Sequence, residues 1–121
     1  MIELEQLVQR FVGVWNETDS KARRATIETL WTVDGRHLMG ASDVGGYDAL
    51  ETRVLASHER SVVQGGNTFR PATAIRRLGD VVKFRWEMAK RDSGEITSSG
   101  VGFLKIDQSG KISSDYLFVE T

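Results

Sequence analysis

Apolar and polar side chains alternate through the stretch VVKFRWEM, which spans Val81 to Met88. A period of two residues is typical of a β-strand that buries one face. The apolar face is formed by Val82, Phe84, Trp86 and Met88. Glycine-containing turns at 79–80 and 91–94 leave room for a neighbouring strand on each side. We therefore expect this stretch to be the central strand of a curved antiparallel sheet.

Upstream of this strand, apolar residues recur at the three- and four-residue spacing of amphipathic helices. Residues 2–17 carry one such stripe, made of Leu4, Leu7, Val8, Phe11, Val14 and Trp15. A second helix is expected to start with a cap at Ser20 or Asp19 and to reach Leu30 or Trp31. After the glycine-rich turn GASDVGG, a third helix presents Tyr47, Leu50, Val54 and His58 on one side.

From Thr68 onward the pattern is extended and is interrupted only by turns. It predicts four strands, at 68–78, 81–90, 95–106 and 111–119, in addition to a short strand at 36–39. Pro71 has no N–H to donate, so it should lie at a bulge, a strand start or an unpaired edge. Helices followed by antiparallel strands predict one α+β domain over residues 1–121, with three N-terminal helices packed into a curved antiparallel sheet as a cone-like α+β barrel.

Composition narrows the function classes. The chain has 121 residues with 16 basic and 17 acidic side chains, so no net field would attract nucleic acid. It has no cysteine, which removes disulfides and thiol chemistry and is compatible with a cytoplasmic location. The start of the chain, MIELEQLVQR, is acidic and amphipathic, unlike a signal peptide or a membrane span. We expect no cofactor, no nucleic-acid partner and no membrane partner.

Five segments together resemble the nuclear transport factor 2-like superfamily and, within it, the SnoaL-like proteins. They are VQRFVGVWNETD, LWTVDGRHLM, GGYDALETRV, GDVVKFRWEM and GVGFLKIDQSGKI, and they span nearly the whole chain. The resemblance implies an open cone with an apolar pocket at its mouth. The superfamily includes ketosteroid isomerases, polyketide cyclases, limonene epoxide hydrolase and non-enzymatic binding or dimerisation domains, so the fold does not choose among these functions.

The resemblance also allows the catalytic positions to be compared. Ketosteroid isomerases use a tyrosine on the first helix, a protonated aspartic acid on the penultimate strand and an aspartate base. The corresponding positions here are Phe11, Gly102 and Met39. None of the three carries an acid, a base or a hydroxyl. The same glycine replaces the acid of SnoaL-type cyclases, so neither mechanism is expected.

An enzymatic alternative comes from the polar face of the same strand. Arg85 and Glu87 resemble the Arg-x-Asp pair of limonene epoxide hydrolase, and Asp115 on the last strand offers a second carboxylate. Burying that face would require every charge to be paired, whereas burying Phe84 and Trp86 has no such requirement. His37 and His58 have no neighbours at metal-ligand spacing, so no metal site is expected.

We therefore expect a module that binds a hydrophobic small molecule in an apolar cavity, with an enzyme or a ligand-free dimerisation domain as alternatives. The predicted lining is Phe11, Trp15, Met39, Leu50, Val54, Phe84, Trp86, Gly102 and Leu104. Gly102 is expected to widen the floor, so that Gly102→Leu would fill the space. Apolar residues on both faces of the last strands predict a homodimer through the outer sheet face, involving Leu117, Val119, Val101 and Phe103.

Overall fold

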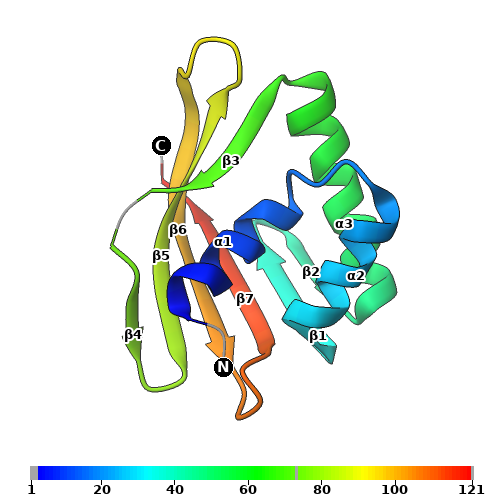
Figure 1. Cartoon of the computed structure of the whole chain (residues 1–121), viewed down its shortest axis with the longest axis vertical. Coiled ribbons are helices and arrows are strands. Elements are labelled where there is room, and N and C mark those ends of the chain that lie inside the picture. The colour runs from blue at the N-terminus through cyan, green and yellow to red at the C-terminus, as the bar shows by residue number, and fades with distance from the viewer. Residues whose placement is uncertain (1–2, 73, 121) are drawn as a thin grey trace.

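The structure, a computed structural model, describes residues 3–72 and 74–120. Three α-helices, α1 (Leu4–Val14), α2 (Ser20–Leu30) and α3 (Tyr47–Ser57), pack on a curved seven-stranded sheet, and a π-helix, η1 (His58–Gln64), continues α3. Figure 1 shows α1 lying across the long strands, with α3 beside the first hairpin. The α+β class predicted from the sequence is confirmed, although the sheet is open and does not close into a barrel.

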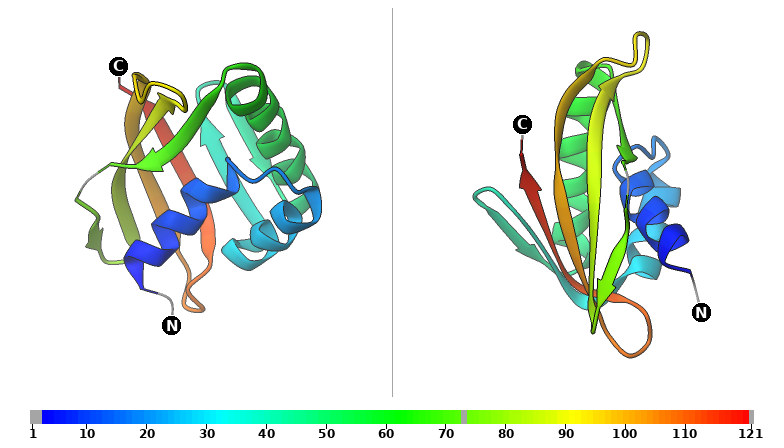
Figure 2. Two further views of the ribbon diagram at one scale, coloured as in Figure 1. Left: turned by 45° about the horizontal axis from the view of Figure 1, so that its top comes forward. Right: turned by 90° about the vertical axis from the view of Figure 1, so that its left-hand side faces the viewer.

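The sheet has the order β2-β1-β7-β6-β5-β3, and β4 also pairs with β5. Its strands are β1 (Trp31–Met39), β2 (Ser42–Gly45), β3 (Asn67–Pro71), β4 (Arg76–Leu78), β5 (Val81–Lys90), β6 (Ile96–Ile106) and β7 (Ile112–Val119). All neighbours are antiparallel except β1 and β7, which run parallel. In Figure 2 the long strands are seen from the side, with α1 and α2 on the same side of them.

The strand VVKFRWEM is not central, contrary to the sequence-based expectation. It forms most of β5, which pairs with β6 on one side and with β3 and β4 on the other, so it lies next to the sheet edge. The difference arises because β1 adds in parallel to β7 and extends the sheet at the far side. A parallel pair joins segments that are distant in the sequence, and no local turn signal announces it.

Two predicted boundaries also differ from the structure. The predicted strand at 68–78 is divided into β3 and β4, and β3 ends at Pro71 on the sheet edge, where a missing N–H is tolerated. The short strand predicted at 36–39 starts five residues earlier, because the second helix ends at Leu30, as predicted, and β1 begins at once with Trp31. Gly35 then lies inside the strand, where an added Cβ would be 2.8 Å from Cδ1 of Trp31. Its lack of a side chain makes room for the buried indole.

The core forms where the helical stripes meet the inward face of the sheet. Val82, Phe84 and Trp86 are buried on β5, while Lys83 and Arg85 between them are exposed. Phe11 of α1 lies among the aromatic rings, with its centroid 5.6 Å from that of Trp31 and 5.7 Å from that of Phe84. The apolar face of the strand therefore points inward, as the alternation indicates.

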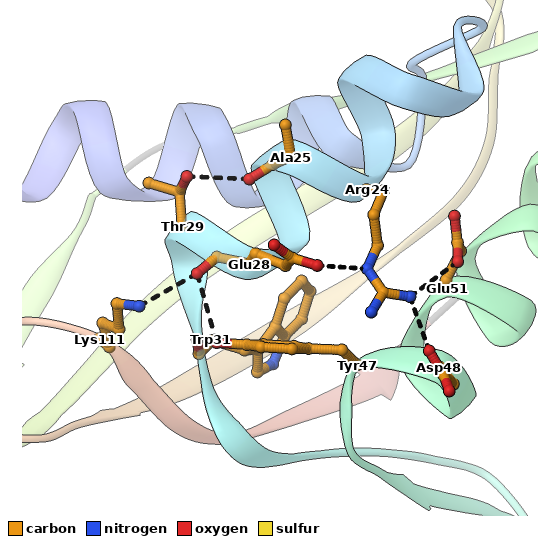
Figure 3. A network of polar contacts seen from close by, with 9 residues as sticks. All are labelled: Arg24, Ala25, Glu28, Thr29, Trp31, Tyr47, Asp48, Glu51 and Lys111. Carbon is orange, nitrogen blue, oxygen red and sulfur yellow. Dashed lines mark hydrogen bonds and ion pairs between the residues drawn. The ribbon is translucent and has the colours of Figure 1, made fainter.

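A polar network fixes α3 against α2 (Figure 3). The Arg24 guanidinium on α2 donates to Glu28 on its own helix, at 2.6 Å, and to Asp48 and Glu51 on α3, at 2.8 and 2.9 Å. The Tyr47 hydroxyl at the start of α3 donates to the Trp31 carbonyl oxygen at 3.0 Å. These contacts set the position of α3, whose later turns form one wall of the cavity described below.

Candidate functional site

A cavity of about 310 Å³ lies between α1, the α3–η1 segment and the inward face of the sheet. Apolar side chains make up most of its wall. The lining residues are Phe11, Val12, Trp15, Met39, Arg53, Ser57, Arg60, Ser61, Phe69, Phe84, Trp86, Met88, Ser98, Leu117 and Val119. Ligand pockets commonly measure about 300–1,000 Å³, and ordinary cores contain few voids larger than a water molecule. The space is therefore of ligand size.

Two indole rings contribute donors that have no acceptor. Trp15 and Trp86 are 3% and 4% exposed, and the Nε1 atom of each is buried without a hydrogen-bond partner among the described residues. Indole nitrogen is a donor only, and most buried donors in proteins are paired. Both residues line the cavity, but each Nε1 atom is itself buried within the packed wall.

The backbone on either side of Trp15 is firmly held. His58 donates from Nδ1 to the Trp15 carbonyl oxygen at 3.0 Å, which assigns this histidine a structural role. Asn16 donates to the Phe69 carbonyl oxygen at 2.7 Å and accepts from the Phe69 N–H at 2.8 Å. These bonds join the end of α1 to η1 and β3, so the indole is placed by three elements rather than by its helix alone.

The polar part of the wall comes from α3 and η1. Arg53, Ser57 and Ser61 follow one another at four-residue intervals, and the π-helical turn adds Arg60. Single π-turns are often found at functional sites, since they change which side chains share a face. Among the described residues, neither arginine side chain makes a hydrogen bond or an ion pair, and Nε of Arg53 is buried without a partner. Burial and the nearby Arg60 charge lower the pKa of Arg53.

The two arginines and three serines were not predicted from the sequence. The available signal was the spacing of Arg53, Ser57 and Ser61 along the face adjoining the apolar stripe of α3. Exposed charged residues commonly occupy that place on a surface helix. Only the curvature of the sheet shows that this face borders a cavity.

Five of the nine predicted lining residues border the cavity, namely Phe11, Trp15, Met39, Phe84 and Trp86. Leu50, Val54 and Leu104 are buried in the core and do not line it.

Gly102 does not widen the floor of the cavity, which corrects the expectation from the sequence. An added Cβ at Gly102 would be 2.7 Å from Cε1 of Phe84, because the phenyl ring already covers the glycine. Trp31, in contrast to Trp15 and Trp86, belongs wholly to the core.

The structure does not bring Arg85, Glu87 and Asp115 together. On the outer face of β5, Arg85 lies 3.4 Å from Glu120, and Glu87 accepts from Arg70 at 3.0 Å. Asp115 is fully buried on the inward face of β7. The two groups are separated by the sheet itself, so the arrangement suggested by the epoxide hydrolase resemblance is absent.

Asp115 instead forms a buried chain with two residues of β1. Its Oδ2 forms a 2.6 Å hydrogen bond with Nδ1 of His37, and its Oδ1 accepts from Nε1 of Trp31 at 3.0 Å. Burial raises the pKa of Asp115, and the bonds from His37 and Trp31 offset part of that rise. The ring of Trp15 packs on His37 at 4.9 Å between centroids, and neither His37 nor Asp115 lines the cavity.

Among the described residues, the cavity wall therefore offers donors and apolar surface but no carboxylate. Phe11 and Met39, which occupy positions of catalytic residues in the ketosteroid isomerase resemblance, supply only apolar surface. In the part of the chain that the structure describes, no group of three histidine, cysteine or acidic residues is arranged to bind a metal ion. Within the same residues, no helix has the length and apolar character required to span a bilayer.

No protein-family model matches the sequence, and no curated protein matches it. Solved structures do match in fold. A proposed isomerase of the SnoaL-like family from Agrobacterium tumefaciens is 20% identical, with a TM-score of 0.85 over 97% of both chains. A nuclear transport factor 2-like protein of unknown function from Exiguobacterium is 20% identical, with a TM-score of 0.68 over 94% of this chain and 98% of that one.

A proposed polyketide cyclase from Sinorhizobium meliloti is 14% identical, with a TM-score of 0.70 over 93% of both chains. At these identities the similarity concerns the fold and not the activity. The neighbours agree with the arrangement of helices and open curved sheet described above. The chain thus has the fold of the nuclear transport factor 2-like proteins, and SnoaL-like structures are among its neighbours.

Proposed function

We propose that this protein binds a hydrophobic small molecule in the cavity between α1, α3–η1 and the sheet. The observation that carries the proposal is a ligand-sized, largely apolar space walled by the aromatic rings of Phe11, Trp15, Phe84 and Trp86. Ordinary cores contain few voids larger than a water molecule, so a space of this size is more than imperfect packing leaves. A hydrophobic ligand would fill it.

The enzymatic alternative has less support. General acid–base catalysis needs a titratable group within hydrogen-bonding reach of the substrate. In the part of the chain that the structure describes, no carboxylate and no histidine lines the cavity. Arg85 and Glu87 lie on the outer face of the sheet, and Asp115 already bonds to His37 and Trp31. Binding without chemistry is therefore the better account of this wall.

The proposal can be tested with N-phenyl-1-naphthylamine, an uncharged dye whose fluorescence rises in apolar surroundings. Ser98 and Ser99 are neighbours on β6, and only Ser98 lines the cavity. Ser98→Trp should obstruct the cavity and abolish dye binding, while Ser99→Trp should leave it intact because its side chain points to the other face. Absence of dye binding to the wild type, or equal binding by both variants, would refute the proposed function.

We also propose that the protein forms a homodimer through an outer apolar patch, defined here as Val101, Phe103, Tyr116 and Phe118. Strand pairing places Val101 opposite Phe118 and Phe103 opposite Tyr116, and the rings of Phe103 and Phe118 lie 6.0 Å apart. Phe118 is 54% exposed. Leu117 and Val119, which the sequence analysis included in this surface, point to the cavity instead.

A further inference from the structure

The charge on the cavity wall differs from that of the whole chain. The sequence carries a net charge of −1, with acidic and basic residues in near balance. Within residues 3–72 and 74–120, the lining nevertheless contains Arg53 and Arg60 and no aspartate or glutamate. Two positive charges beside an apolar floor form a local positive site in a protein that has no general positive field.

Neither arginine of the cavity wall has a carboxylate partner among the described residues. On the outer sheet face, Arg36, Arg70 and Arg85 each have a carboxylate within 3.4 Å. Arg53 is only partly exposed, and within the described residues its side chain has no acceptor although its Nε is buried. Burial and the charge of Arg60 both lower the pKa of Arg53, so each acts against its charged form. A negative group in the cavity would relieve both effects.

The remaining polar groups on the wall favour the same kind of ligand. Both guanidinium groups on the wall can only donate. The serine hydroxyls of Ser57, Ser61 and Ser98 can donate as well. The charged groups on the wall are all donors. Such a wall is complementary to a ligand group that only accepts hydrogen bonds, such as an oxyanion.

We propose that the ligand of this cavity is an amphipathic organic anion, with an apolar ring system and one carboxylate-like oxyanion bound by Arg53 and Arg60. The ring system lies on Phe11, Phe84 and Met88. Guanidinium groups suit this role because their planar donors match an oxyanion in geometry as well as in charge. The inference rests on the proposed function and specifies its ligand class.

Two dyes with the same skeleton test the inference. They are 1-anilinonaphthalene-8-sulfonate, which carries an oxyanion, and N-phenyl-1-naphthylamine, which lacks it. A charge-assisted hydrogen bond corresponds to roughly tenfold or more in affinity. The wild type should therefore bind the sulfonate at least about tenfold more tightly than the uncharged dye. Equal affinities would overturn the inference, while loss of both affinities would instead refute the proposed function.

Arg53→Gln and Arg60→Gln should each lower the ratio of the two affinities by about tenfold. Arg70→Gln is the matched control, since it removes an arginine of the outer face and should leave the ratio unchanged. Circular dichroism identifies any variant that does not fold. If one of the two cavity-arginine variants does not fold, the affinity ratio of the other variant is the test. A ratio that stays at the wild-type value in the folded arginine variants, or that falls equally in Arg70→Gln, would overturn the assignment of the anion to this wall.

Discussion

The ring of Phe84 on β5 covers Gly102 on β6, its direct partner across the two strands. The next inward pair repeats the relationship, because an added Cβ at Gly100 would be 2.7 Å from Cζ2 of its partner, Trp86. Glycine lets each large ring lie against the sheet without a clash. The aromatic floor of the cavity therefore depends on two glycines that do not themselves line it.

Gly102→Ala should destabilise the protein by roughly 1–3 kcal/mol, the usual cost of overpacking a core. The new methyl group would meet Phe84 and would also lie 2.9 Å from Cδ2 of Leu117. Gly13→Ala is the control. Gly13 lies in α1 with no atom within 4 Å of its added Cβ, so this change should stabilise by about 0.5–1 kcal/mol. Urea unfolding of both variants measures the difference, and a neutral or stabilising Gly102→Ala would contradict the packing described here.

Asp115→Ala should lower the free energy of unfolding by roughly 2–6 kcal/mol. Each buried polar group left without a partner costs about 1–3 kcal/mol, and the change leaves both His37 and Trp31 unpaired. Trp31→Phe removes only one of the two bonds to Asp115 and should cost less. Denaturant unfolding compares the two variants. Equal stability of Asp115→Ala and the wild type would show that the buried chain does not stabilise the fold.

The stability contributed by Asp115 should depend on pH. Burial raises the pKa of this carboxyl in the folded state above its unfolded value of about 3.9. The folded protein then binds the proton more tightly, so the contribution is complete below about pH 3.9 and is lost as pH rises through the raised pKa.

The stability difference between wild type and Asp115→Asn should accordingly shrink as pH increases from 4 to 8, a range chosen as roughly spanning this window. Parallel urea titrations at several pH values measure it, with the Asn variant as the reference that lacks the carboxyl. A difference that grows with pH would mean that His37 holds the carboxylate in its charged form.

The proposed homodimer should be lost when a charge is placed in the outer apolar patch. Phe118→Glu puts a carboxylate opposite Val101, in the middle of the apolar surface that a partner subunit would bury. Leu78→Glu is the control, since Leu78 is 86% exposed on β4 and lies outside the patch. Sedimentation at tens of micromolar, an order-of-magnitude choice for specific dimers, should give a dimer for the wild type and the control. A monomeric wild type would remove the proposal.

Local periodicity in the sequence predicted much of the fold. The alternation through β5 predicts that Phe84 and Trp86 point inward, and the stripe on the first helix predicts that Phe11 and Trp15 meet them. These predictions hold because burial of apolar surface acts on each face of a strand or helix in the same way wherever it lies in the chain. Four of the fifteen residues that line the cavity could therefore be identified from local patterns alone.

Only the tertiary structure determines which residues these buried faces contact. His37 and Asp115 are 78 residues apart and meet because β1 pairs in parallel with β7. Arg60 reaches the cavity because α3 continues as a π-helix. The side chain of Phe84 covers Gly102, so this glycine accommodates an aromatic ring and leaves no free space. A sequence pattern indicates which side of an element is buried. Strand order, helix winding and rotamers determine which residues that side contacts. These three features depend on the energy of the whole packed core.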